Sequence, residues 1–172
     1  MKKMQPQPNI TIRLFKISDF HQVQEIYKQG VETRNATFES HIPFWEEWNR
    51  KFIEEPRLVA VLNDRVVGWA MLSRVSLRDV YSGVCEISLY IHKKYRKRGI
   101  GKALLNELIT QSENYNIWTL QAGIFPENKV SIKLHKDCGF REVGYREKIG
   151  KMDDEWRDTI LLERRSKEVG LT

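Results

Sequence analysis

The sequence contains little cysteine, no long apolar run and no grouped histidines. Its two cysteines among 172 residues, Cys85 and Cys138, are too few for a disulfide scaffold, and neither lies in a C-x-x-C pair. No apolar segment approaches the roughly 20 residues that span a bilayer, and the N-terminal lysines precede no apolar stretch. The four histidines are scattered without metal-ligand spacing. These absences predict a cytoplasmic protein with reduced thiols, no metal and no membrane partner.

The charge of the chain is concentrated in one place. The net charge is +6, and the acidic residues are spread along the sequence. Six basic residues lie within a short stretch: Lys93, Lys94, Arg96, Lys97, Arg98 and Lys102. A nucleic-acid-binding protein would instead carry basic and aromatic residues along an extended face. The clustering therefore favours a phosphorylated ligand, and we expect no nucleic-acid partner.

The hydrophobic pattern predicts an α/β fold in a single domain. Alternating or buried apolar runs indicate strands at 9–16, 83–93, 117–125, 140–150 and 155–165, and a hairpin over 57–75 that turns at Asn63-Asp64. Helical periodicity indicates helices at 18–32 with Ser18 as N-cap, at 43–55 and 100–115, and from about 127 to Gly139. This order predicts a mixed, mostly antiparallel sheet with helices on both faces and one parallel β-α-β unit.

The loop inside that β-α-β unit reads R96-K97-R98-G99-I100-G101 and leads directly into a predicted helix. Backbone amides at a helix N-terminus bind phosphate, and glycines let the backbone approach it closely. The spacing does not match a Walker A loop or a dinucleotide fingerprint. The loop therefore suits a pyrophosphate, although a merely solvated basic helix start fits the same six residues.

The wider stretch resembles the GNAT N-acetyltransferase superfamily. The segment 96–101 is similar to its R/Q-x-x-G-x-G/A acetyl-CoA signature, with EISLYI before it and the expected helix after it. RNATFE (34–39), AGIFPEN (122–128) and W156-R-D158 resemble the phosphinothricin acetyltransferase group. The resemblance covers roughly 10–164, which we expect to be one domain with flexible tails at 1–9 and 165–172. It implies an acetyl-CoA-dependent enzyme and a homodimer.

The resemblance also implies which residues bind acetyl-CoA. The strand around Leu89, Tyr90 and Ile91 is expected to pair with the pantetheine arm, and a backbone amide there to polarise the thioester carbonyl. The phosphates are expected to bind at the loop formed by Arg96, Lys97, Arg98, Gly99, Ile100, Gly101 and Lys102. Asn128 and Ser131 belong to a second motif, N128-K-V-S131, that resembles a further cofactor element.

Strand alternation identifies a candidate general base. In VCEISLYIH it places four residues with polar groups on one face: Glu86, Ser88, Tyr90 and His92. An amine is mostly protonated near neutral pH and must lose a proton before it attacks a thioester. A carboxylate can accept that proton directly or through water, so Glu86 is the candidate base. The alternative is a solvent-facing or salt-bridged glutamate on an ordinary strand.

A histidine is the second candidate catalytic residue. Asn128, Ser131 and His135 lie at i, i+3 and i+7, on one face of their predicted helix. Many members of the superfamily carry a tyrosine in the place of His135, as acid for the leaving thiolate. His135 could act in that way, could help to deprotonate the amine, or could be a structural histidine.

The resemblance implies a small amino-acid-like acceptor such as phosphinothricin, methionine sulfoximine or methionine sulfone. Such anions call for arginine, and Arg74 and Arg78 precede the strand of Glu86. Phe38, Glu39 and Tyr81 are the remaining candidates for the acceptor pocket. A protein or peptide amine, another small amine, and a non-catalytic acyl-CoA-binding role stay open as alternatives.

Overall fold

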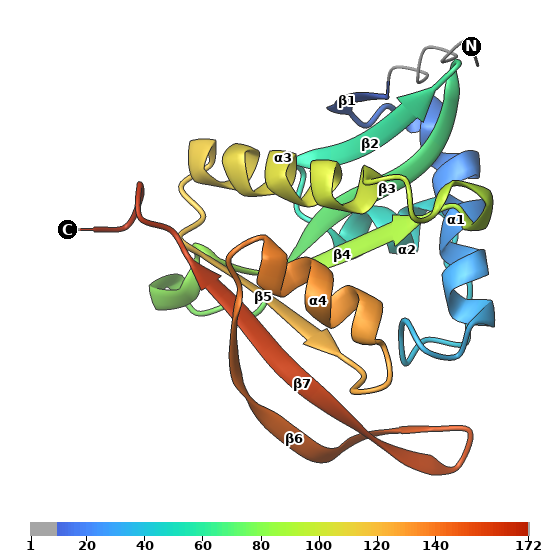
Figure 1. Cartoon of the computed structure of the whole chain (residues 1–172). Helices are drawn as coiled ribbons and strands as arrows, with labels where there is room; N and C mark the ends of the chain where they lie inside the picture. Colours follow the sequence, from blue (N-terminus) through green and yellow to red (C-terminus); the bar gives the residue numbers. More distant parts are fainter. Residues whose placement is uncertain (1–9, 172) are drawn as a thin grey trace, which may run out of the picture.

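The computed structural model describes residues 10–171, so the predicted N-terminal tail at 1–9 lies outside the described residues. One seven-stranded sheet runs in the order β1-β2-β3-β4-β5-β7-β6 (Figure 1). The strands are β1 (Thr11–Leu14), β2 (Arg57–Leu62), β3 (Arg65–Arg74), β4 (Val84–Ile91), β5 (Thr119–Ile124), β6 (Arg141–Met152) and β7 (Glu155–Arg165). The α-helices are α1 (Phe20–Glu32), α2 (Trp45–Lys51), α3 (Ile100–Asn114) and α4 (Lys129–Asp137). Short 3-10 turns are η1 (Ile17–Asp19), η2 (Asp79–Tyr81) and η3 (Lys93–Tyr95).

The sheet is mixed, as the sequence pattern predicts. β4 and β5 pair in parallel, while the other neighbouring strands pair antiparallel. The crossover from β4 to β5 is α3, which confirms the β-α-β unit. The β2–β3 hairpin turns at Asn63 and Asp64, both with positive φ, as the Asn-Asp turn signal predicts.

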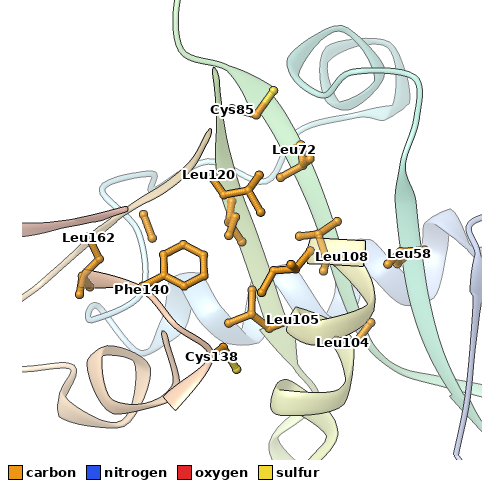
Figure 2. Close-up of a cluster of buried hydrophobic side chains, with 14 of the residues drawn as sticks. Leu58, Leu72, Cys85, Leu104, Leu105, Leu108, Leu120, Cys138, Phe140 and Leu162 are labelled. Carbon is orange, nitrogen blue, oxygen red and sulfur yellow. The ribbon is translucent and has the colours of Figure 1, made fainter. Parts of the chain in front are cut away.

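Helices cover both faces of the sheet. On one face, leucines of α3 pack against the central strands around Leu72 and Leu120 (Figure 2). On the other face, α1 and α2 contribute to an aromatic cluster in which Trp48 and Trp69 lie 4.8 Å apart, ring centre to ring centre. Burial of these two apolar faces fixes the sheet between two helical layers.

Several helix ends differ from the sequence prediction. Ser18 is not an N-cap: residues 17–19 form η1, and the Asp19 carboxylate accepts from the Lys16 amide at 2.8 Å. Helix α2 is shorter than the predicted 43–55, because the backbone becomes extended at Phe52. In this conformation the Phe52 residue is buried, with 5% of its surface exposed. Gly139 follows α4 with φ +88°, which confirms it as the residue that ends that helix.

The chain beyond the last strand packs against the domain. Strand β7 includes Arg165, and Ser166 behind it is buried. The Ser166 hydroxyl donates to a Glu113 carboxylate oxygen at 2.8 Å, and that carboxylate also accepts from Arg164 at 3.1 Å. The end of β7 is therefore joined to the end of α3.

Candidate active site

The two parallel strands separate after a short paired stretch. β4 and β5 pair over three positions, ending at Glu86 with Gln121. Beyond them β4 continues to Ile91 alongside β3, whereas β5 continues alongside β7 (Figure 1). The β4 edge from Ile87 to Ile91 thus has backbone groups that no β5 partner satisfies, and an extended ligand could pair with them.

A cleft of about 260 Å³ lies where the strands separate. The lining comes from the loop 35–39, the end of α2, Ser73 of β3 and residues 86–90 of β4. It also includes residues 122–125, which follow the part of β5 that pairs with β4, and one face of α4. Six segments distant in sequence therefore meet in one hollow. Phe38, Glu39, Glu86, Asn128, Ser131 and His135 line it together, as do Leu89 and Tyr90.

Glu86 stands at the point of separation. Its carboxylate accepts a hydrogen bond from the Gln121 side-chain amide at 3.0 Å, and it is otherwise exposed to the cleft. Ser73 is its cross-strand partner on β3, so the serine hydroxyl belongs to the same face of the sheet. The carboxylate is thus held in a defined orientation while one side stays open to an acceptor or water.

His135 is buried, with 4% of its surface exposed. Its Nδ1 lies 2.8 Å from the Ser131 carbonyl oxygen, which only accepts, so Nδ1 carries the proton. Burial lowers the pKa of this imidazole, and the bond to Ser131 opposes that shift in part. The histidine is therefore neutral near pH 7. Its Nε2 is left with a free lone pair and has no hydrogen-bond partner among the described residues.

Asn128 joins α4 to the loop that lines the cleft at residues 35–39. Its side-chain oxygen accepts from the Ser131 amide at 3.2 Å and so caps the helix. Its Nδ2 donates to the Asn35 carbonyl at 3.2 Å. Sequence reasoning assigned Asn128 to the cofactor, and the structure gives its side chain these two positioning contacts.

Aromatic contacts hold the loop 33–40 against the sheet. The Tyr90 ring stacks on Trp69 with centroids 4.8 Å apart, and its hydroxyl donates to the Ala36 carbonyl at 3.4 Å. Burial raises the pKa of the Tyr90 phenol, which is therefore protonated at neutral pH. Phe38 meets Phe125 edge to face at 4.8 Å. Phe38, Tyr90 and Phe125 thus give the cleft aromatic walls, whereas Glu86 contributes a charged group.

The glycine loop has the geometry that a phosphate site needs. Gly99 adopts φ +77° and forms the N-cap of α3, so the next amides have no helical acceptor. A Cβ on Gly101 would lie 3.2 Å from Leu134 of α4, so a side chain there would crowd the α3–α4 contact. Ile100 is buried in the core and can meet a ligand only through its backbone.

The basic residues of this loop are available to a ligand. Among the described residues, none of these four has a salt-bridge partner: Arg96, Lys97, Arg98 and Lys102. All four are exposed. The donor set of amides and cations thus fits the phosphates of an acyl-coenzyme A.

Three predicted acceptor residues do not line this cleft. Arg74 pairs with Cys85 in the β3–β4 register, one position along from Ser73 and Glu86, so alternation turns it to the other face of the sheet. It lines a separate hollow with Cys85 and Tyr115. Arg78 and Tyr81 lie in the exposed β3–β4 loop, where the Arg78 guanidinium lies 5.3 Å from the Tyr81 ring centre. Strand parity therefore places Arg74 apart from Glu86, and its assignment to acceptor binding stays a prediction.

The structure adds cleft residues that sequence reasoning missed, among them Lys51, Ser73 and Phe125. No local pattern could have found Ser73, because its place opposite Glu86 depends on the β3–β4 register. Lys51 follows the buried Trp48 by three residues on α2, so it shares its helix face. The three-residue spacing from Trp48 was the feature of the sequence that could have indicated Lys51.

Within residues 10–171, no group of three or more His, Cys, Asp or Glu side chains is arranged to hold a metal ion. The helices of the same residues include none that is both long and apolar enough to cross a membrane.

Comparison with known proteins identifies the class. Residues 12–161 match a family model described as an Acetyltransferase (GNAT) domain, so the chain belongs to the GNAT acetyltransferase family. It is an acetyltransferase with the fold of that family. Its curated relatives include a phosphinothricin N-acetyltransferase of Alcaligenes faecalis, 29% identical over 90% of this chain and 81% of the relative.

A second relative is the L-methionine sulfoximine/L-methionine sulfone acetyltransferase of Salmonella typhimurium, 26% identical over 90% of this chain and 93% of its own length. Among solved structures, a phosphinothricin acetyltransferase from Sinorhizobium meliloti in complex with AcCoA has a TM-score of 0.85 and 29% identity. The match covers 95% of this chain and 91% of that structure's chain. A ribosomal-protein-alanine N-acetyltransferase from Brucella melitensis has a TM-score of 0.83 and 30% identity, and the match covers 91% of this chain and 99% of that structure's chain.

Proposed function

We propose that the protein transfers the acetyl group of acetyl-CoA directly to the primary amine of a small amino-acid-like acceptor. The observation that carries this proposal is the position of Glu86. Its carboxylate lies at the separation of β4 and β5, in the same cleft as Phe38 and Glu39, which we assign to the acceptor. The names of the relatives from Alcaligenes faecalis and Salmonella typhimurium support the acceptor class.

Acetyl-CoA supplies a thioester whose acetyl group can be transferred. The amides that follow Gly99 and the basic side chains around them would bind the phosphates. The edge of β4 from Leu89 to Ile91, which β5 does not pair, would bind the pantetheine arm, as the resemblance implies. One of its backbone amides would donate to the thioester carbonyl and stabilise the negative charge that develops on that oxygen.

Glu86 would remove the proton that the acceptor ammonium must lose, directly or through one water. The freed nitrogen lone pair then attacks the thioester carbonyl carbon, so that a C–N bond forms and the C–S bond breaks. The sulfur leaves as a thiolate and takes up, directly or through water, the second proton that the attacking nitrogen must lose, which gives the CoA thiol and the neutral amide. The proton on Glu86 then returns to solvent. His135 has a buried nitrogen lone pair at the same cleft, and a second proton-accepting role would explain why its Nε2 carries no partner.

The test is acetyl-CoA turnover, followed by thiol release, against methionine sulfoximine, methionine sulfone, phosphinothricin, ordinary amino acids, polyamines and short peptides. Wild type is compared with Glu86→Gln, which keeps the shape and an oxygen acceptor for Gln121. Glu46 is an exposed residue of α2 outside the cleft, and Glu46→Gln, which also removes one carboxylate, is the control. We expect at least a hundredfold lower kcat for Glu86→Gln only, since general-base catalysis contributes about that factor. Equal turnover in the two variants would reject Glu86 as base.

A peptide or protein amine is the second candidate acceptor, favoured by the name of the solved relative from Brucella melitensis. The same panel separates the two candidates. Turnover confined to short peptides would support protein acetylation, whereas turnover confined to free amino acids or their sulfoximine analogues would support the small acceptor. Binding of acetyl-CoA without turnover of any acceptor would favour an acyl-CoA-binding role.

A cytoplasmic homodimer is part of the same proposal. Several large apolar side chains are exposed on the β3–β4 loop and the β6–β7 hairpin, including Leu77, Val80 and Trp156, and a second copy could cover them. Light scattering after size exclusion, at several protein concentrations, tests the association. A monomer at every concentration would reject the dimer.

A further inference from the structure

One lysine gives the cleft a charge that the proposed reaction does not use. Lys51 is the last residue of α2 and lines the cleft together with Ser73 and Glu86. Among the described residues, it is the single lysine or arginine on the cleft wall. We propose that Lys51 binds the carboxylate of the acceptor and so selects free α-amino acids. This inference rests on the proposed function and names the anchor for its substrate.

The position of Lys51 is fixed by the packing of its helix. Trp48, one turn earlier on the same face, is 1% exposed. Its ring meets Tyr27 at 5.3 Å and Phe52 at 4.9 Å, measured between ring centres. Buried aromatic contacts of this kind leave the helix little freedom to shift. The lysine backbone is therefore held beside the cleft, which the residue lines.

The ammonium group is held over aromatic rings and not in an ion pair. Its Nζ lies 5.9 Å from the centre of the Tyr27 ring and 5.7 Å from that of Phe52. No carboxylate of the described residues lies within 4.0 Å of it, although Glu39 and Glu86 line the same cleft. The charge is thus available to a ligand.

The cleft as a whole then matches the two charges of an amino acid. Its carboxylates, Glu39 and Glu86, face an acceptor ammonium, and His135 adds no positive charge because it is neutral. Lys51 is left as the partner for an anion. A lysine ammonium can donate to one carboxylate oxygen at a time from a flexible stem, so it suits acceptors that differ in side chain.

This assignment separates classes of acceptor. An α-amino acid has its carboxylate next to the amine, and Lys51 would pair with it. A peptide N-terminus has a neutral amide in that place, and a polyamine has no anion, so both would lose the interaction. Arg74, which sequence reasoning assigned to this role, lies on the other face of the sheet and does not line the cleft.

The experiment compares two acceptors that differ by one group: L-methionine sulfone and the amine obtained from it by decarboxylation. KM and kcat for each are measured with wild type, Lys51→Met, Lys51→Arg and Arg50→Met. Arg50 is the adjacent α2 cation, exposed and outside the cleft, so its variant removes the same charge. Calorimetry of acetyl-CoA and of methionine sulfone with each variant provides binding readouts that do not depend on turnover.

We expect Lys51→Met to raise KM for methionine sulfone roughly 10- to 100-fold, which corresponds to the loss of a charge-assisted hydrogen bond. For the decarboxylated amine, KM should change by less than about twofold, and the affinity for acetyl-CoA should be unchanged, because neither involves this charge. Lys51→Arg should recover most of the loss, and Arg50→Met should behave as wild type.

Equal effects of Lys51→Met on both acceptors, or no effect on either, would overturn the role of Lys51 while leaving the acetyltransfer intact. A wild type that acetylates the decarboxylated amine but not methionine sulfone would also overturn it. A wild type that binds acetyl-CoA but neither binds nor acetylates methionine sulfone would overturn the amino-acid acceptor and the lysine together. The last result is distinguishable because it appears before any substitution is made.

Discussion

The side-chain amide of Gln121 donates a 3.0 Å hydrogen bond to the Glu86 carboxylate, and the same two residues form the last parallel pair before β4 and β5 separate. The strand pairing and the side-chain bond thus fix one carboxylate at the edge of the opening. A general base works only when it is within reach of the proton that it removes.

Gln121→Leu should therefore lower kcat roughly tenfold, since small misplacements of catalytic groups are costly. The affinity for acetyl-CoA should stay the same, because Gln121 does not touch the glycine loop. Steady-state kinetics with calorimetry for acetyl-CoA check the two expectations. Gln121→Glu places a second carboxylate beside Glu86 and should lower kcat as well. An unchanged kcat in both variants would mean that Gln121 does not orient Glu86.

Gly99→Ala tests the backbone of the phosphate loop. Gly99 has φ +77° and free space around the position of a Cβ, so the cost is conformational and should be about 1 kcal/mol. We expect a weaker affinity for acetyl-CoA and a lower Tm. Gly144→Ala is the matched control, since a Cβ there also meets nothing within 4 Å and the residue has no positive φ. Equal behaviour of the two variants would argue against a special role for the conformation of Gly99.

Arg157→Met tests how the β6–β7 hairpin supports the acceptor side of the cleft. The guanidinium lies 4.0 Å from the centre of the Phe125 ring and donates to the Arg34 carbonyl at 3.1 Å. Phe125 in turn supports Phe38. Loss of these contacts should loosen the loop and raise the acceptor KM several-fold, with acetyl-CoA affinity unchanged. Arg146→Met, on the same hairpin and free of salt bridges among the described residues, should leave the acceptor KM at the wild-type value.

The pH dependence of stability reports the burial of His135. Its pKa is lowered in the folded protein, whereas an unfolded histidine titrates near about 6.5. Above that pH both states are neutral at this site, and its contribution to stability is fully present. As pH falls below about 6.5, the unfolded chain takes up a proton that the folded protein resists, so stability is lost down to the folded pKa.

Tm measured from pH 8 to pH 5 in steps of about half a unit should therefore fall more steeply for wild type than for His135→Gln, which cannot be protonated. His21→Gln, at an exposed position of α1, is the control and should follow the wild-type curve. Parallel curves for wild type and His135→Gln would show that His135 does not contribute to the acid loss.

The order of elements and the local chemistry could be predicted from the sequence, because they depend on neighbours along the chain. The glycine loop, the parallel unit around it and the glycine that ends α4 follow from period, turn residues and backbone freedom. Strand alternation likewise indicated that Glu86, Ser88 and Tyr90 share a face. Helix ends were less predictable, because burial of Phe52 and the hydrogen bonds of Asp19 outweigh local propensity.

The composition of the cleft was decided by the tertiary structure. The β3–β4 register sets Ser73 opposite Glu86 and turns Arg74 to the other face, and no local pattern states that register. The loop that carries Phe38 is held by Arg157, more than a hundred residues away, and by Asn128. Lys51 reaches the cleft because Trp48, one turn earlier on α2, is packed in the aromatic cluster with Tyr27 and Trp69. The sequence by itself determined which chemical groups this protein has and on which elements they lie, whereas long-range packing alone decided which of them meet.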